Sequence, residues 1–503
     1  MLLRERFTVS FIGLFIGMVC TPSRYAYAGY YYDFNPTCRK AYAEIIQLKL
    51  VSGAALIEAE KKADPDNLIP YFLENYIDFF TLFFNEDPVE YQRRKPGEEQ
   101  RLNLMKKGDI HSPFALFTRS VIYFQWAAID IKFGNRWDAG WSFRKSFLAG
   151  KDNLQHFAGF QPSLMLQGAM QVAAGTIPPG YQWLANLLGI HGTIADGMNT
   201  LEEVLTSTDP FAKLFHEEAV FYFLYLKFHI QNQREEVFQY IHKHQLDTRN
   251  NHLFTYLAAN LSRNNQQAAA AEQIVRDRNP DPEYLDMPVW DLEMGYAMAD
   301  HLDPVSISYL ERFLKRFKGK FYVKESLQKL SWMYYLDGRP DKAENARARL
   351  LRMGNTETEA DKQAMKDAQS GRWPNTLLLK ARLLDDGGYF HEALQLLNGK
   401  SSSSFTGAAD QLEFAYRLAR LYDALNRKEE AVQAYLTTIK LGEHRKEYYA
   451  ARAALQTGYI YEERGDGKTA ISFFQKVLDL KGHDYKNALD QKAKAAIERC
   501  RNG

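Results

Sequence analysis

The sequence has no excess of charge of either sign. Its 503 residues include 63 Lys and Arg and 62 Asp and Glu, so the formal net charge is +1. Nucleic-acid-binding proteins usually carry a basic excess or a basic stripe, and highly charged disordered chains carry an excess of one sign. The balance argues against both classes, and no nucleic-acid partner is expected. At 46% hydrophobic and 25% charged residues, the composition is that of a globular protein.

The N-terminus lacks an apolar run long enough to span a membrane but has the pattern of a secretory signal. Arg4 and Arg6 precede an uncharged apolar run at residues 8–19, and the small-x-small sequence Ala26-Tyr27-Ala28 follows. The run is shorter than the ~20 residues of a spanning helix. We expect residues 1–28 to be a signal peptide cleaved after Ala28, which places the mature protein in the periplasm or at the cell surface. An uncleaved anchor and a lipoprotein processed at Cys20 are the alternatives.

Cysteine is scarce. Cleavage after Ala28 removes Cys20 and leaves Cys38 and Cys500, and it changes the net charge to −1. An exported protein can keep disulfides, but a bridge needs Cα atoms within about 7 Å. The ends of an extended repeat array lie far apart, so a Cys38–Cys500 bridge and two unpaired thiols both remain open.

Strand signals are also scarce, whereas helical spacing with an internal period is widespread. Residues 414–439 and 453–478 share one pattern, in which Tyr422 and Tyr461 hold equivalent positions 39 residues apart. The period is close to the ~34 residues of a tetratricopeptide repeat plus a longer connection. In this pattern, small residues such as Gly458 and Ala470 lie where two helices cross, and aromatic residues fill the space between hairpins.

Weaker copies of the same pattern occur upstream, at residues 123–143, 221–241, 327–346 and 377–397, with fainter ones at 253–271 and 292–313. The sequence therefore predicts an all-α, tetratricopeptide-type helical-hairpin solenoid. Its predicted parts are an N-terminal helical region at 29–215, tetratricopeptide repeats at 216–480, and a C-terminal capping helix and tail at 481–503.

One central segment has no charge at all. Residues 153–195 contain no Asp, Glu, Lys or Arg, and Pro178-Pro179-Gly180 divides them into helix candidates at 161–177 and 181–190. Three interpretations remain open: a buried helical pair, a surface that docks on a membrane or holds an apolar ligand, and a membrane hairpin. Neither candidate reaches a comfortable spanning length.

The same segment carries a resemblance to a known family. Its apolar helix, Pro-Pro break, second apolar helix and Gly-rich turn resemble the central signature of the tetratricopeptide-repeat 39 and inclusion-body-clearance family. The matching residues are Gly168, Pro178, Pro179, Leu187, Leu188, Gly189, Gly192, Gly197 and Leu201. The resemblance covers roughly residues 40–480, loosely outside 157–205. It implies a helical scaffold with no catalytic residues to carry over. The signal peptide departs from the intracellular members, so we expect an exported, bacterial relative.

Catalytic, cofactor and metal motifs are missing. Gly467-Lys468-Thr469 imitates the end of a phosphate loop, but Glu462 stands where that motif requires glycine. His242 and His244 are two residues apart and diverge on a helix, so they cannot share a metal from one face. We expect no catalytic, cofactor-binding or metal-binding residues.

A binding role is what remains. Repeat arrays bind partners along the inner faces of their first helices. The repeat template places five candidate partner-binding residues there: Trp332, Arg382, Tyr416, Arg420 and Tyr459. Arginine forms paired hydrogen bonds with carboxylates, and tyrosine offers a rigid contact surface, so these residues favour a protein or peptide ligand. The alternatives are ordinary surface residues at these positions, a lipid- or membrane-surface-associated protein using segment 153–195, and an enzyme without a sequence-local motif.

Overall fold

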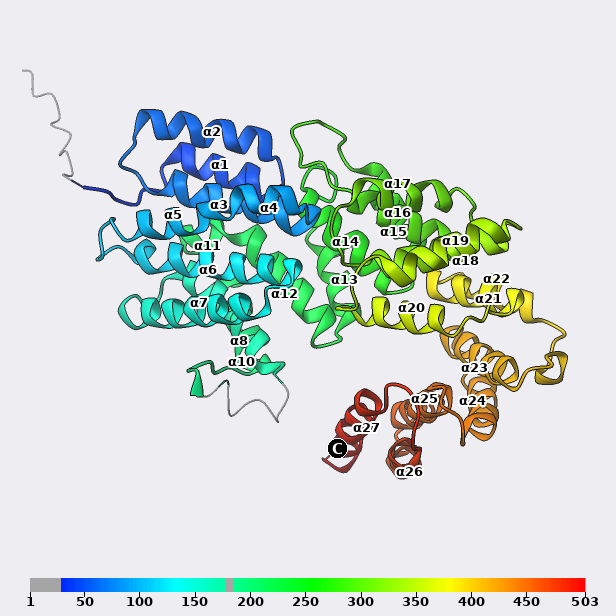
Figure 1. Ribbon diagram of the computed structural model, residues 1–503. Helices are drawn as coiled ribbons and strands as arrows, with labels where there is room; N and C mark the ends of the chain where they lie inside the picture. The colour runs from blue at the N-terminus through cyan, green and yellow to red at the C-terminus, as the bar shows by residue number, and fades with distance from the viewer. Residues whose placement is uncertain (1–28, 178–184, 186, 503) are drawn as a thin grey trace, which may run out of the picture.

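The protein is a curved stack of helices (Figure 1). The computed structural model describes residues 29–177, 185 and 187–502. Within these residues the regular structure is helical, and β-type pairing is limited to one bridge between Tyr31 and Asn67. The predicted all-α, tetratricopeptide-type solenoid is confirmed. The signal peptide predicted at 1–28 and the Pro-Pro-Gly break lie outside the described residues.

Successive helices pack mostly as hairpins joined by short turns. The N-terminal helices are α1 (Pro36–Ile46), α2 (Leu50–Ala63), α3 (Ile69–Asn85), α4 (Pro88–Arg94), α5 (Pro96–Met105), α6 (Pro113–Phe133), α7 (Arg136–His156), α8 (Gln161–Gly175), α10 (Ile194–Thr206) and α11 (Pro210–Leu214). The central helices are α12 (His216–His229), α13 (Arg234–Lys243), α14 (His252–Asn264), α15 (Ala268–Asp277), α16 (Val289–Asp300), α17 (Ser306–Arg316), α18 (Val323–Leu336), α19 (Pro340–Arg352) and α20 (Glu359–Gln369). The C-terminal helices are α21 (Thr376–Gly387), α22 (Phe390–Leu397), α23 (Ala408–Ala424), α24 (Lys428–Gly442), α25 (Tyr449–Glu463), α26 (Gly467–Asp479) and α27 (Lys486–Asn502), with a short 3₁₀ turn, η1 (Ser402–Ser404), before α23.

Local sequence sets many of the helix ends. Asn35 and Ser112 accept backbone hydrogen bonds at the starts of α1 and α6, and a proline follows each of them. An Asn or Ser cap satisfies amides that have no partner inside the helix, and proline in the first turn loses no hydrogen bond. Gly134 and Gly388 end α6 and α21 with φ values of +84° and +87°. Glycine adopts this left-handed conformation without steric cost, so both helices stop there.

The last repeat shows how small residues let the hairpin close. A Cβ atom on Gly458 of α25 would lie 2.4 Å from the Phe474 ring of α26. Ala470, one turn before Phe474, is fully buried. The two helices therefore pack at a distance that only small side chains at these positions permit. This agrees with the repeat register predicted from the sequence.

Helix α20 lies outside the hairpin alternation and caps its neighbour. The buried Asp361 carboxylate accepts hydrogen bonds from the backbone N–H groups of Tyr322, Lys324 and Glu325, at 2.9, 3.0 and 3.1 Å. These amides begin α18 and have no acceptor within that helix. The side chain of Asp361 thereby fixes α20 against the start of α18.

The apolar core is a series of overlapping clusters. The largest runs from Phe34 to Met298, and smaller ones follow at residues 292–383, 378–421 and 416–497. Because neighbouring clusters share helices, each hairpin is stabilised by the next, as in other repeat arrays. The largest cluster continues across residue 215, so the predicted parts 29–215 and 216–480 share one core. Their division into an N-terminal helical region and tetratricopeptide repeats stays a prediction.

Within the uncharged segment, helix α8 is part of the core, whereas Leu187 is 74% exposed. Helix α8 packs against α7, α10 and α12, and its Leu166, Met170 and Val172 are at most 2% exposed. Gly168 and Gly197 bring α8 and α10 into backbone contact, since a Cβ on either would come within 3 Å of the other's carbonyl oxygen. Across the described residues, we find no helix that combines the length and hydropathy needed to cross a membrane.

Cys38 and Cys500 lie in different parts of the stack. Cys38 is buried in α1 and Cys500 is partly exposed in α27, and both are free thiols. Helix α27 packs against α25 and α26 at the C-terminal end.

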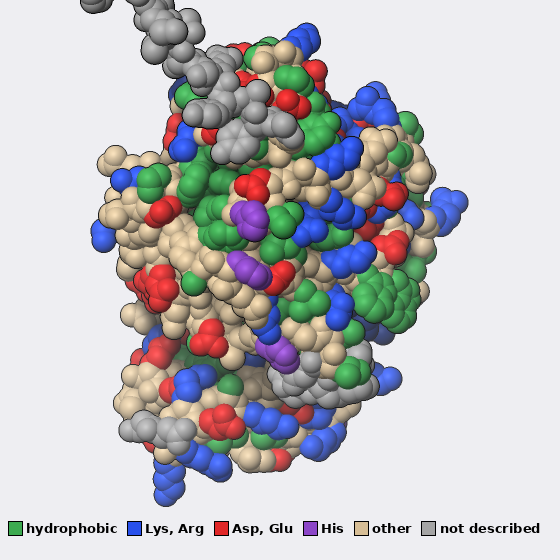
Figure 2. Space-filling model, turned by 90° about the vertical axis from the view of Figure 1, so that its left-hand side faces the viewer, with side chains coloured by type: hydrophobic (Ala, Val, Ile, Leu, Met, Phe, Trp, Pro, Cys, Tyr) green, Lys and Arg blue, Asp and Glu red, His purple; other side chains and the backbone are tan. Residues whose placement is uncertain are grey.

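The face shown in Figure 2 carries acidic side chains among basic ones, and neither sign of charge covers it alone.

Candidate partner-binding face

The structure brings four of the five predicted residues together. Trp332 lies on α18, Arg382 on α21, and Tyr416 and Arg420 on α23. The Arg382 guanidinium lies over the Trp332 ring, 4.8 Å from its centroid. Such a contact attracts a cation to the electron-rich ring face and fixes both side chains.

Charged side chains join the helices of this face. Arg420 approaches Asp385 with an Nη1–Oδ2 distance of 3.3 Å, and the buried Arg417 approaches the same carboxylate at 3.8 Å. Arg382 and Arg420 each lie 3.9 Å from the neighbouring Asp386. Although burial acts to raise the pKa of Asp386, the nearby guanidinium groups outweigh it and lower that pKa. The Arg420 contacts join α21 to α23 and the Arg382 contact lies within α21, so both residues have a structural role in addition to any contact with a partner.

Two of the predicted contact residues offer little surface. Tyr416 is 2% exposed and Trp332 is 7% exposed. The Tyr416 ring stacks on Tyr449 of the next hairpin, with centroids 4.7 Å apart. The repeat template placed Tyr416 on the inner face as a contact residue, but the next hairpin covers it. Tyr416 therefore contributes packing between hairpins and little contact surface.

Tyr459 lies apart from the other four. It is on α25, where its ring packs 5.4 Å from that of Phe474. It lines a separate pocket of about 450 Å³ with Asp423, Lys428 and Arg499. This pocket lies toward the C-terminal end of the stack, where α23, α24, α25 and α27 meet.

A groove of about 410 Å³ extends from Trp332 and Arg382 toward α25. Side chains of both charges and several aromatic rings line it; those most relevant to binding are Arg347, Lys366, Arg372, Trp373, Lys446, Tyr448 and Tyr449. Trp373 is held between the Tyr335 ring, 4.7 Å away, and the Arg347 guanidinium, 4.4 Å from its centroid. The groove presents aromatic surface beside exposed cations, a combination common at protein interfaces.

Sequence reasoning missed the part of this groove that comes from connections. Arg372 and Trp373 precede α21, and Lys446 and Tyr448 precede α25. The repeat template assigns positions within helices and gives no register for residues between them. The one local feature that could have indicated this part of the groove is Trp373, a tryptophan in an otherwise polar connection.

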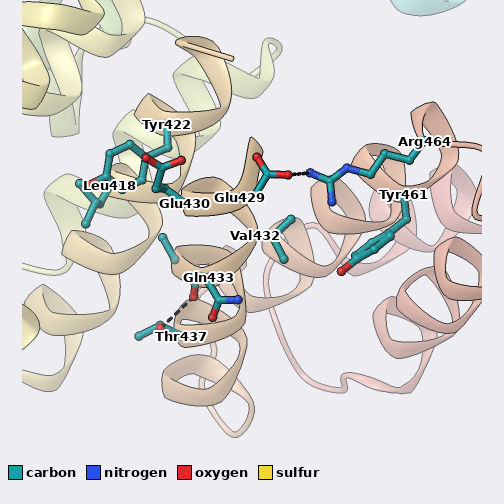
Figure 3. A pocket seen from close by; sticks show the side chains of 10 residues that line it. Leu418, Tyr422, Glu429, Glu430, Val432, Gln433, Thr437, Tyr461 and Arg464 are labelled. Carbon is teal, nitrogen blue, oxygen red and sulfur yellow. Dashed lines mark hydrogen bonds and ion pairs between the residues drawn. The ribbon is translucent and has the colours of Figure 1, made fainter. Parts of the chain in front are cut away.

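A second surface pocket lies where hairpin α23–α24 meets α25 (Figure 3). Tyr422 and Tyr461, the two residues that revealed the repeat period, both line it. Glu429 and Arg464 form an ion pair of 2.9 Å across it. The pocket has a volume of about 560 Å³ and follows from the junction between successive repeats.

No arrangement suited to a metal was found in the described part of the chain, where no three His, Cys, Asp or Glu side chains converge. His244 stacks on Tyr240 with centroids 4.1 Å apart. At Gly467-Lys468-Thr469, the Asp466 side chain accepts a hydrogen bond from the Thr469 amide. An aspartate caps the helix at this point, and its negative charge opposes a phosphate there.

Comparison with known proteins gives no family. No protein-family model matches the sequence, and no curated protein matches it. Similar solved structures include the TPR domain of P58(IPK), with 12% identity over 82% of this chain and 95% of that one, at a TM-score of 0.23. The APC/C hetero-tetramer Cut9–Hcn1 matches with 11% identity over 93% and 97% of the two chains, at 0.25. Yeast Tom70 matches with 13% identity over 84% and 97%, at 0.23. Scores this low carry no functional argument, so the fold assignment rests on the hairpins themselves.

Proposed function

We propose that this protein is a non-enzymatic scaffold that binds a segment of a protein partner in the groove between α18 and α25. The observation that supports this is the convergence of exposed cations and aromatic rings from several hairpins on one groove. Rings provide contact area at low entropic cost, and arginine forks match carboxylates of a peptide. The expected partner segment therefore carries acidic and aromatic or aliphatic side chains.

The predicted export belongs to the same proposal. The charged start, apolar run and Ala26-Tyr27-Ala28 favour an exported scaffold whose mature form begins at Gly29. The segment between 157 and 205 supports a relationship to the tetratricopeptide-repeat 39 and inclusion-body-clearance family. Detection of Gly29 as the N-terminal residue of the protein from its native host would test the export signal directly.

Site-specific photo-crosslinking tests the groove. A photoreactive phenylalanine analogue at Ser370, an exposed residue of the groove, should crosslink a partner in the native host. The same analogue at Lys440, exposed on α24, is the matched control and should not. Equal crosslinking from both positions, or none from Ser370, would contradict the proposal.

Charge reversal gives a second test. Arg372 and Lys446 are exposed groove cations with no ion pair among the described residues. Exchanging both for Glu should weaken capture of the crosslinked partner at least tenfold without changing the melting temperature. Lys440→Glu with Lys468→Glu changes the net charge equally on other surfaces and should leave capture unchanged.

A further inference from the structure

A cavity in the N-terminal half has an unusual lining. It has a volume of about 390 Å³ and lies where α3, α6, α8, α12 and α14 meet. Its walls are mostly aromatic rings and small side chains, among them Tyr76, Phe79, Phe80, Phe83, Phe84, Phe124, Ala128, Ala169, Ala173, Phe221, Tyr222 and Tyr256. Phe79, Phe83, Phe124 and Phe221 are only partly buried. This volume falls in the range of small-molecule sites, about 300–1,000 Å³.

One acidic side chain, Glu218 of α12, lies in the wall of this cavity and is 5% exposed. Its carboxylate accepts hydrogen bonds from the hydroxyl groups of Tyr42, Tyr76 and Tyr222, at 2.7, 3.0 and 2.8 Å. No basic side chain lies within ion-pairing distance of it in the described part of the chain. The three hydroxyls supply hydrogen bonds but no positive charge. Buried carboxylates are normally paired with a cation, so this one lacks its usual partner.

Lys132, the one basic residue among the described residues that line the cavity, is already paired elsewhere. Lys132 bonds Glu86 at 2.9 Å, and its ammonium group lies 4.9 Å from the Phe83 centroid and 4.5 Å from that of Phe321. Glu86 also accepts hydrogen bonds from the backbone amides of Lys320 and Phe321. This pair joins the loop before α18 to α3 and α6. It leaves Glu218 without a basic partner among the described residues; burial raises the pKa of this carboxyl, and the hydrogen bonds from Tyr42, Tyr222 and Tyr76 act to lower it.

The remaining surface of the cavity favours positive charge. Aromatic rings carry negative potential on their faces, and a cation within about 6 Å of a ring centroid is attracted to it. Phe124 and Tyr222 pack edge to face, 6.1 Å apart, beside the Glu218 carboxylate that Tyr222 bonds. Ring faces and an unpaired carboxylate therefore surround the same space.

We propose that this cavity binds a small organic cation, an ammonium or quaternary ammonium group carried on an apolar body, with Glu218 as the counter-charge. The apolar body packs against the phenylalanines of α3 and α12. Phe321, Tyr322 and Thr358, from the connections around α18 and α20, complete the lining, and the volume of about 390 Å³ suits a small molecule. This inference is independent of the groove proposed above.

Two probes of one shape test the role of charge. Benzyltrimethylammonium and neopentylbenzene differ only in the atom that carries the methyl groups, nitrogen or carbon. Ligand-observed NMR titration of the full chain should give a dissociation constant at least tenfold lower for the ammonium, a difference of about 1.4 kcal/mol. Equal affinities, preference for the neutral probe, or binding of neither probe would overturn the proposal.

Three variants test whether the preference for the ammonium probe arises in this cavity. Glu218→Gln removes the charge, keeps one oxygen that can accept hydrogen bonds from Tyr42 and Tyr76, and should reduce the preference to within twofold. Tyr42→Phe removes one hydrogen bond from Glu218 outside the cavity lining and should keep the preference. Ala128→Phe fills the cavity and should weaken both probes at least tenfold. If Glu218→Gln unfolds the chain, the two probes on the wild-type protein and on Ala128→Phe still test whether the cavity prefers the cation. A preference that survives Ala128→Phe would place the cation elsewhere and refute the assignment.

Discussion

Replacing Gly458 with alanine tests the packing of the last repeat. An added Cβ would lie 2.4, 2.6 and 2.9 Å from three ring carbons of Phe474, and that ring is fully buried. The ring cannot move into solvent, so α25 and α26 must separate or Phe474 must leave its rotamer. Gly140 of α7 is the matched control, because it is also inside a helix but has no heavy atom within 4 Å of the added Cβ.

The magnitude follows from two opposing effects. Alanine stabilises a helix interior by up to about 1 kcal/mol relative to glycine, and this gain applies to both variants. Overpacking a close-packed contact costs about 1–3 kcal/mol, and this cost applies to Gly458→Ala alone. We therefore expect Gly140→Ala to gain up to about 1 kcal/mol and Gly458→Ala to lose about 1 kcal/mol. The difference between them isolates the packing cost.

Hydrogen exchange with mass spectrometry is the assay, because it reports the stability of each hairpin separately. Amides of α25 and α26 should exchange roughly fivefold faster in Gly458→Ala, since 1.4 kcal/mol corresponds to a factor of ten. Amides of α6 and α7 should exchange more slowly in Gly140→Ala. Slower exchange of α25 and α26 in Gly458→Ala would mean that the close contact with Phe474 does not exist, and the reasoning would fail.

Three further predictions concern buried groups. Ala470→Leu should lower the stability by about 1–3 kcal/mol through overpacking. Lys468→Leu, on the exposed face of α26, should change it by less than about 0.5 kcal/mol. Equal melting temperatures for the two variants would contradict the repeat register that places Ala470 between the helices. Burial lowers the pKa of His252 to about 4, so the native state prefers the neutral ring. Stability should be complete above about pH 6.5, the unfolded value, and fall by about 3 kcal/mol as the pH drops to 4; urea titrations of His252→Gln should lack this slope. Asp361→Ala leaves backbone amides at the start of α18 without an acceptor, so the free energy of unfolding measured in urea should fall by about 2 kcal/mol or more. An unchanged urea midpoint would show that water replaces the carboxylate as the acceptor.

The sequence by itself determined the helices and the register of the best repeats. Helical hairpins are local structures, so their signals lie within a few tens of residues of one another. The pair Tyr422 and Tyr461 revealed the period, and the small residues Gly458 and Ala470 indicated where two helices cross. Both inferences required only spacing along the chain, and the packing agrees with them.

Only the tertiary structure decided which inner-face residues are exposed and which distant residues meet. Periodicity gives the direction of Tyr416, but the amount of its surface that α25 covers depends on how closely the next hairpin packs. The carboxylate of Glu218 meets Tyr42 and Tyr76 across sequence separations of 176 and 142 residues. Such contacts arise when the solenoid curves and stacks its hairpins, and spacing within one repeat carries no information about that curvature.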